Sequence, residues 1–138
     1  MLEPIFWLLV GIFALIASTF FIPGVRKVFQ GPQFLVPPII FSLLGAVLIF
    51  LTIKEKTKGM LKKFLILTGA SAAGFFISIF LHNLFYAAAV LTSHIAVLPR
   101  LFKVLHAIFF LIAIPLCPLG FLIGAVGSVV LFVKKKKK

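Results

Sequence analysis

Four long apolar stretches, separated by short segments that hold almost all of the charge, constrain this chain more than any other feature of its sequence. Of its 138 residues, 63% are hydrophobic and 12% are charged, whereas about 25% of the residues of a soluble domain are charged. A soluble fold of this length could not bury so much apolar surface. Each stretch has the roughly 20 residues that a helix needs to cross a bilayer. The sequence therefore predicts a single transmembrane domain over residues 1–138.

The four stretches are expected to be helices, because lipid cannot satisfy free backbone groups and none of them alternates as a barrel strand does. The predicted spans cover residues 4–22, 34–53, 64–91 and 104–133. The last two are longer than a crossing requires, so they should tilt or protrude. Pro115 and Pro118 should kink the fourth span. The predicted fold class is all-α, an integral membrane antiparallel four-helix transmembrane bundle.

The charge of the chain is strongly basic and unevenly distributed. Fourteen Lys and Arg residues oppose only Glu3 and Glu55, which gives a formal charge of +12. Ten of the basic residues fall in the segments Lys54–Lys63 and Lys134–Lys138, and the other four are Arg26, Lys27, Arg100 and Lys103. The positive-inside rule then predicts a cell-membrane protein with both termini cytoplasmic. The two lysine-rich segments are expected to contact anionic lipid head groups, and no nucleic-acid partner is expected.

Polar residues recur along one face of the third span. Ser71, Gly74, Ser78, His82 and Tyr86 follow one another at intervals of three or four residues, with Asn83 beside His82. A histidine or an asparagine inside a membrane span is costly unless it is paired, so such residues suggest a functional face. Two interpretations stay open. The residues form interhelical hydrogen bonds, or they line a path for a small transport or permeation protein.

Small residues indicate close helix packing in the third and fourth spans. Gly120, Gly124 and Ser128 follow one another at intervals of four, which lets a second helix approach closely. Gly69 and Gly74 offer similar notches in the third span. His106 and Cys117 lie on the same face of the fourth span as its small residues. These patterns predict packing between the third and fourth spans, or contact with a second copy of the chain.

The three histidines raise the question of a metal or a haem. With the predicted spans, His82 lies about nine residues from the end of its helix and His106 about two, a difference in depth of roughly 10 Å. Axial ligands of one haem iron need nearly level positions, and zinc needs three or four close ligands. We therefore expect no metal and no cofactor, and keep a haem-binding membrane anchor only as the weaker alternative.

The residue set gives little support for catalysis. The two carboxylates lie at the ends of spans, and a Ser78–His82 pair would lack an orienting acid. Cys117 is the only cysteine, which excludes an internal disulfide. The sequence thus predicts a protein that is not an enzyme. Its expected role is that of an accessory or assembly subunit, which packs through spans three and four as a homo-oligomer or within a larger membrane complex.

Overall fold

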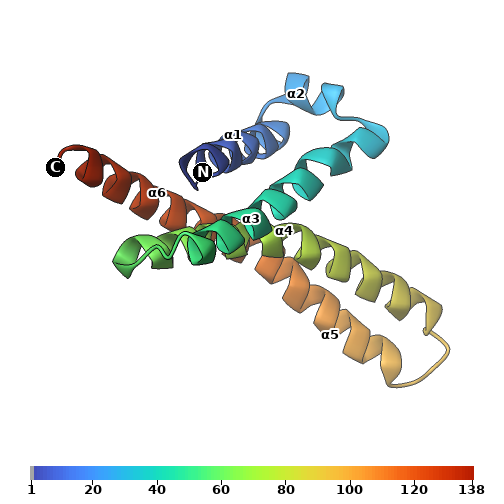
Figure 1. Ribbon diagram of the computed structural model, residues 1–138. Coiled ribbons are helices and arrows are strands. Elements are labelled where there is room, and N and C mark those ends of the chain that lie inside the picture. Colours follow the sequence, from blue (N-terminus) through green and yellow to red (C-terminus); the bar gives the residue numbers. More distant parts are fainter. Residues whose placement is uncertain (1) are drawn as a thin grey trace.

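The computed structural model describes residues 2–138, which form helices joined by short turns (Figure 1). The elements are α1 (Leu2–Phe21), α2 (Pro23–Val28), a 3₁₀-helix (Gly31–Leu35), α3 (Val36–Lys54), α4 (Gly59–Leu91), α5 (Leu98–Leu111), a π-helical segment (Ile112–Leu116) and α6 (Cys117–Lys136). Four stretches are long and apolar enough to cross a membrane: Leu2–Phe21, Gly31–Lys54, Gly59–Leu91 and Leu98–Lys136. The prediction of an all-α protein, with four long apolar helices packed as a bundle, is confirmed.

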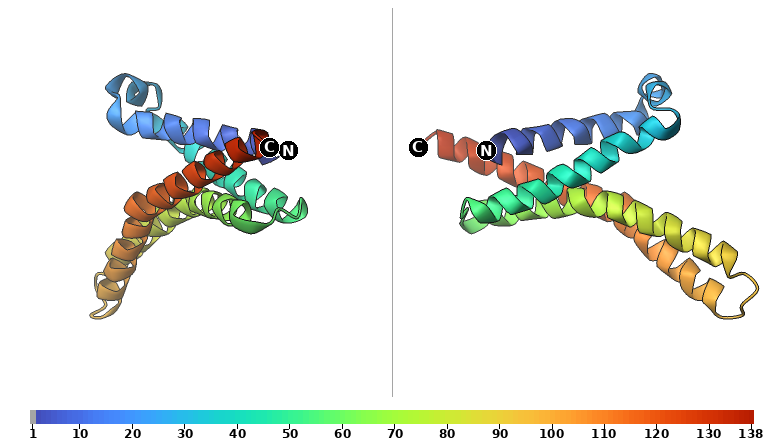
Figure 2. Two further views of the ribbon diagram at one scale, coloured as in Figure 1. Left: turned by 90° about the vertical axis from the view of Figure 1, so that its left-hand side faces the viewer. Right: turned by 45° about the vertical axis from the view of Figure 1, so that its right-hand side comes forward.

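Helix α4 is the central element of the bundle. It packs against α3 on one side and against α5 and α6 on another, while α1 packs against α3 (Figure 2). Side chains of α1 also reach α6, because the ring of Phe13 stacks on that of Phe121 with 4.5 Å between their centres. The two helices also meet through Phe6 and Phe132, whose ring centres lie 5.5 Å apart. Most helices therefore depend on α4 for their position.

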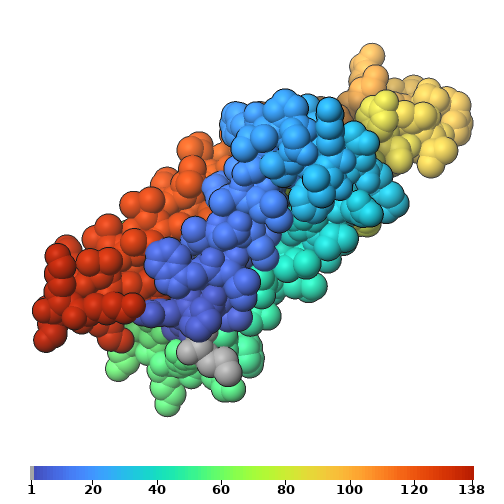
Figure 3. All heavy atoms as spheres, turned by 90° about the horizontal axis from the view of Figure 1, so that it is seen from above, coloured from blue at the N-terminus to red at the C-terminus, as the bar shows by residue number. Residues whose placement is uncertain are grey.

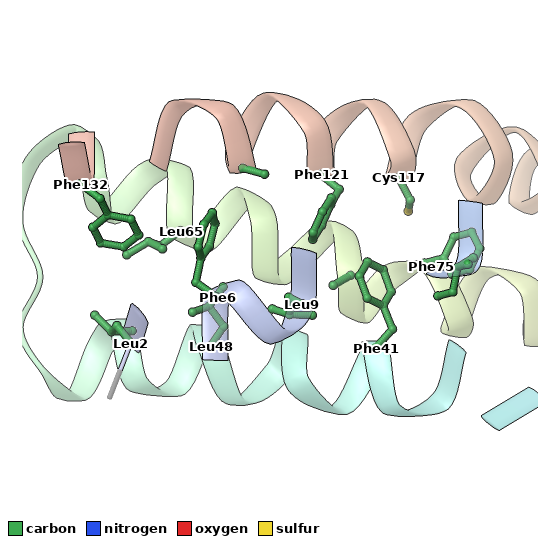
Figure 4. Close-up of a cluster of buried hydrophobic side chains, with 13 residues drawn as sticks. Leu2, Phe6, Leu9, Phe41, Leu48, Leu65, Phe75, Cys117, Phe121 and Phe132 are labelled. Carbon is green, nitrogen blue, oxygen red and sulfur yellow. The ribbon is translucent and has the colours of Figure 1, made fainter. Parts of the chain in front are cut away.

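The core of the bundle is apolar and rich in phenylalanine. Leu9 of α1, Leu48 of α3 and Leu65 of α4 are fully buried, and Phe121 of α6 is nearly so. Figure 4 shows these side chains directed toward one another from four helices. In lipid the gain from such a core comes from close packing and dispersion rather than from leaving water.

The third and fourth spans begin earlier than the predicted boundaries. Helix α4 starts at Gly59 rather than at residue 64, and α5 starts at Leu98 rather than at residue 104. The lysines and arginines near these boundaries predict loops, whereas Lys62, Arg100 and Lys103 lie in the first helical turns. Their long side chains can reach the head groups from within a helix, so charge marks the end of the hydrocarbon and not the end of the helix.

The fourth span is interrupted at its proline, as expected, but by a π-helical segment. Pro115 has no backbone N–H and its ring would clash with the carbonyl four residues earlier. The Cys117 N–H instead donates to the carbonyl of Ile112, five residues back. The wider turn absorbs the clash. Figure 2 (left) shows that α5 and α6 run in different directions on the two sides of this segment.

Both ends of the chain lie at the same end of the bundle (Figure 1). Lys136 Nζ is 3.4 Å from Glu3 Oε2, and the turn between α3 and α4 lies at this end too (Figure 2). At the opposite end the C-terminal part of α4, the turn that follows it and the start of α5 extend past α1 and α3 (Figure 3). We call residues 82–111 the arm. Within it α5 packs mainly against α4.

Candidate functional site

Two histidines at the base of the arm form a reciprocal pair. The turn between α4 and α5 spans residues 92–97, so His82 and His106 lie about equally far from it. Their rings stack with 3.8 Å between centres and 22° between planes. His82 Nδ1 lies 2.9 Å from the His106 carbonyl oxygen, and His106 Nδ1 lies 3.0 Å from the His82 carbonyl oxygen. The predicted difference in depth of about 10 Å is therefore wrong, because α5 begins six residues earlier than expected.

The partners of the pair determine its tautomers. A carbonyl oxygen only accepts hydrogen bonds, so each Nδ1 carries a proton and donates it. Two further rings lie against the pair with 5.4 Å between ring centres and a tilt of 41°, Phe110 beside His82 and Tyr86 beside His106. The arrangement has a local two-fold symmetry, since each histidine precedes an aromatic residue by four positions on its own helix. Both hydrogen bonds of the pair join α4 to α5, and both are accepted by backbone carbonyl oxygens.

The same geometry does not suit an axially ligated haem. An iron held by two histidines lies between them, with one ring nitrogen of each pointing at it. Here the two rings lie face to face at 3.8 Å and leave no space for a macrocycle. Within residues 2–138, no group of three or more His, Cys, Asp or Glu side chains could hold a metal ion. His94, the third histidine, lies apart in the turn between α4 and α5.

The other residues of the predicted polar face do not continue a path from the histidines. Ser71 and Ser78 are buried, whereas Asn83 and Tyr86 are exposed on the arm. Asn83 Nδ2 donates to the Ile79 carbonyl of its own helix, at 3.0 Å. The structure thus divides the predicted face into buried hydroxyls within the bundle and exposed polar groups on the arm.

The glycines of α6 face α4. A Cβ atom on Gly120 would lie 2.5 Å from Ser71 Oγ, and one on Gly124 would meet the hydroxyl and backbone of Thr68. Gly74 of α4 faces Cys117 Sγ, which would lie 3.6 Å from its added Cβ. Further along α6, Ser128 is fully buried.

The prediction that Gly69 packs against the fourth span is wrong, because Gly69 faces α3. Its added Cβ would lie 2.7 Å from the Gly45 carbonyl oxygen, and a Cβ on Gly45 would lie 2.6 Å from the Gly69 carbonyl oxygen. Beside this contact Ser42 Oγ donates to the Ala72 carbonyl at 3.0 Å. Sequence reasoning missed Gly45 and Ser42. The three-residue interval between them, within a span otherwise built of large apolar residues, is the signal that could have found them.

An apolar cavity of about 590 Å³ lies between α1 and the fourth span. Phe13 and Phe20 of α1 form one wall, Phe121 of α6 forms another, and Phe41 and Phe75 close the floor. Figure 4 shows the last three pointing inward from α6, α3 and α4. The full lining is Phe13, Ile16, Ala17, Phe20, Phe21, Phe41, Ser71, Phe75, Ile114, Cys117, Pro118, Phe121 and Leu122. Nothing in the sequence pattern predicted this cavity, since its residues come from four helices.

No protein-family model, curated protein or solved structure matches this chain. The four candidate spans are what the structure shows, and they support a small multi-pass membrane protein in contact with the lipid bilayer.

Proposed function

We propose that this chain is a non-catalytic assembly subunit of the membrane, and that the arm is the part that engages a second copy or a larger complex. The observation that carries the proposal is the exposure of the arm's tip. Leu91 and Val97 are 75% and 74% exposed, and Val90 is 57% exposed. Helices α1 and α3 do not extend over this part (Figure 3).

The lengths of the helices support a position of the tip outside the hydrocarbon. Asn83 follows Lys63 by 20 residues in α4, a rise of roughly 30 Å along the helix. The hydrocarbon core of a bilayer is about 30 Å thick. Lys103 of α5 is three residues from His106, and therefore lies near the level of the histidine pair. The polar and basic residues at the base of the arm then mark the membrane boundary, and the tip, with its exposed Leu91 and Val97, extends beyond it.

An exposed apolar surface outside the hydrocarbon is typical of a site that another protein covers. A photo-cross-linking residue at Val97 tests this interpretation in cells. We expect a discrete cross-linked product of higher mass. The matched control places the same residue at Val126, which is 62% exposed on α6 within the span and should face lipid. A purely monomeric chain with no product from either position would contradict the proposal.

A non-catalytic role agrees with the environment of the polar groups. Glu3 lies in the first turn of α1 beside Lys136, and Glu55 follows α3. Neither carboxylate lies near the histidine pair, whose Nδ1 atoms are bonded to carbonyls. Of the five residues of the predicted permeation path, Ser71 alone lines the apolar cavity. Permeation along the third span therefore has less support than assembly.

We also propose that both termini are cytoplasmic, with Lys54–Lys63 and Lys134–Lys138 against anionic head groups. The termini and the turn between α3 and α4 share one end of the bundle, so the ten lysines of these segments face one side. In a Cys117→Ala background, Ser93→Cys should react with a membrane-impermeant maleimide on intact cells and Lys138→Cys should not. Labelling with the reverse preference would overturn the orientation.

A further inference from the structure

We infer that the apolar cavity binds one acyl chain of a bilayer phospholipid, with its phosphate held at Arg26. This inference is independent of the proposed role in assembly. It rests on the size and lining of the cavity, on its opening at the surface and on the basic residues at one end.

The volume of the cavity suits a flexible chain. One water-sized group occupies about 30 Å³, so about 590 Å³ corresponds to roughly 20 such groups, a number comparable with the methylenes of one long acyl chain. Cavities that hold small ligands in proteins measure about 300–1,000 Å³. One turn of an α-helix with its side chains is about 10–12 Å across and 5.4 Å long, so it alone would fill the space. A partner's helix could therefore place no more than a single turn inside.

The cavity opens sideways between the helices. Phe21 at its rim is 85% exposed, and Ile114 and Leu122 on the opposite rim are 45% and 46% exposed. Because these helices lie among lipid, the molecule nearest to the opening is a lipid chain. An empty cavity would leave the surrounding rings without contacts on one side, and a lipid chain restores those contacts. The lining offers one hydroxyl, that of Ser71, and otherwise apolar atoms and the Cys117 thiol.

One end of the cavity carries positive charge. Phe20 and Phe21, at the end of α1, line the cavity, and Arg26 folds back on the same end. Its Nε donates to the Thr19 carbonyl at 3.1 Å and its Nη2 to the Phe20 carbonyl at 2.8 Å. A guanidinium has five N–H groups, so donors remain for a phosphate. Lys27 is the next residue and is exposed. An anionic phospholipid matches both the apolar cavity and this charged end.

A cavity-filling variant and a matched control test the site in the intact protein. The protein is reconstituted into vesicles of phosphatidylcholine and phosphatidylglycerol at 3:1 and then extracted in mild detergent. Native mass spectrometry measures the mass of the protein together with any bound lipid. We expect one retained phosphatidylglycerol per chain. Ala17→Phe should lower retention at least tenfold, because Ala17 lines the cavity, whereas Ala14→Phe, one turn earlier and exposed, should retain the lipid. Arg26→Gln should keep one lipid but lose the preference for phosphatidylglycerol.

A second measurement does not depend on filling the cavity. Trp7 is the only tryptophan, so Trp7→Phe with Leu122→Trp places a single fluorophore at the rim of the cavity, and Leu119→Trp gives an exposed control on the same helix. In detergent, phosphatidylglycerol with brominated chains should quench the Leu122→Trp protein at about one lipid per chain and the control only at large excess. Equal quenching of both would overturn the site. The site would also be overturned if the protein formed a dimer without bound lipid and the Ala17→Phe substitution dissociated that dimer. The cavity would then hold a second copy of the chain.

Discussion

The histidine pair allows a prediction that separates its hydrogen bonds from its ring contact. Each hydrogen bond joins a side chain to the partner's backbone carbonyl, at 2.9 Å and 3.0 Å. A bond from His82 therefore survives any substitution of the side chain at His106. Hydrogen bonds between membrane helices contribute about 0.6 kcal/mol on average. His82→Phe and His106→Phe should each lower the free energy of unfolding by about that amount, and the double variant by about 1.2 kcal/mol, with no coupling.

Alanine substitutions should behave differently, because they also remove the ring stack. The two rings lie 3.8 Å apart, and an aromatic pair contributes about 0.5–1.5 kcal/mol beyond its buried area. His82→Ala and His106→Ala would each lose this same contact, which the double variant loses only once. The double-mutant cycle made with alanine should therefore show a coupling free energy of about 1 kcal/mol between the two sites, whereas the cycle made with phenylalanine should show none.

The assay is reversible unfolding in mixed micelles of a mild detergent and sodium dodecyl sulfate, followed by circular dichroism. Phe85→Leu serves as a control within the arm, because Phe85 stacks on Phe102 and Phe109 and contacts neither histidine in the ring stack. A coupling of 1 kcal/mol or more in the phenylalanine cycle would refute the reasoning. It would mean that the two imidazoles interact through their ring nitrogens, by a shared proton or a shared ligand, and not through the backbone.

Three further variants test the packing of the bundle. Gly45→Ala should cost about 1–3 kcal/mol of unfolding free energy, because its Cβ would lie 2.6 Å from a backbone oxygen of α4, while Gly11→Ala, with nothing within 4 Å, should cost nothing. Ser42→Ala should cost about 0.6 kcal/mol in the same micelle assay, through loss of the hydroxyl donor to the Ala72 carbonyl. Pro115→Ala should restore a regular α-helix across Ile112–Leu116, and spin labels on α5 and α6 should report a changed distance; an unchanged distance would place the cause of the bend outside the proline.

The four apolar spans and their helical structure could be predicted from the sequence, because lipid leaves a chain of this kind few alternatives. The boundaries could not. Lys62, Arg100 and Lys103 indicated loops, yet they lie within helical turns, since long basic side chains reach the head groups without ending a helix. The six residues by which α5 begins earlier place His106 about 1.7 turns further into the helix than predicted. The prediction therefore did not bring the two histidines to the same level.

The partners of individual residues could be predicted only where one helix face is dominated by small side chains. Gly120 and Gly124 repeat at four-residue spacing and lie against α4, which is the helix predicted for them. Gly69 has similar local sequence but faces Gly45 of α3, because the central position of α4 gives it two packed faces. Periodicity along one helix shows that a residue faces a neighbour. It does not show which neighbour.

The two halves of the molecule differ in what holds them together. Within the bundle, α4 is covered by α3 and α6, and close contacts at Gly45, Gly69 and Gly124 leave no space for even one added carbon. In the arm, α5 has mainly α4 to pack against, so the histidine pair and the stacked rings of Phe85 account for a larger share of its cohesion. An element with few buried contacts opens more readily than the core it extends from. A partner that covered the tip of the arm would supply the second layer that the chain itself does not provide there, and this is the physical reason for placing assembly at the arm rather than at the glycine-packed bundle.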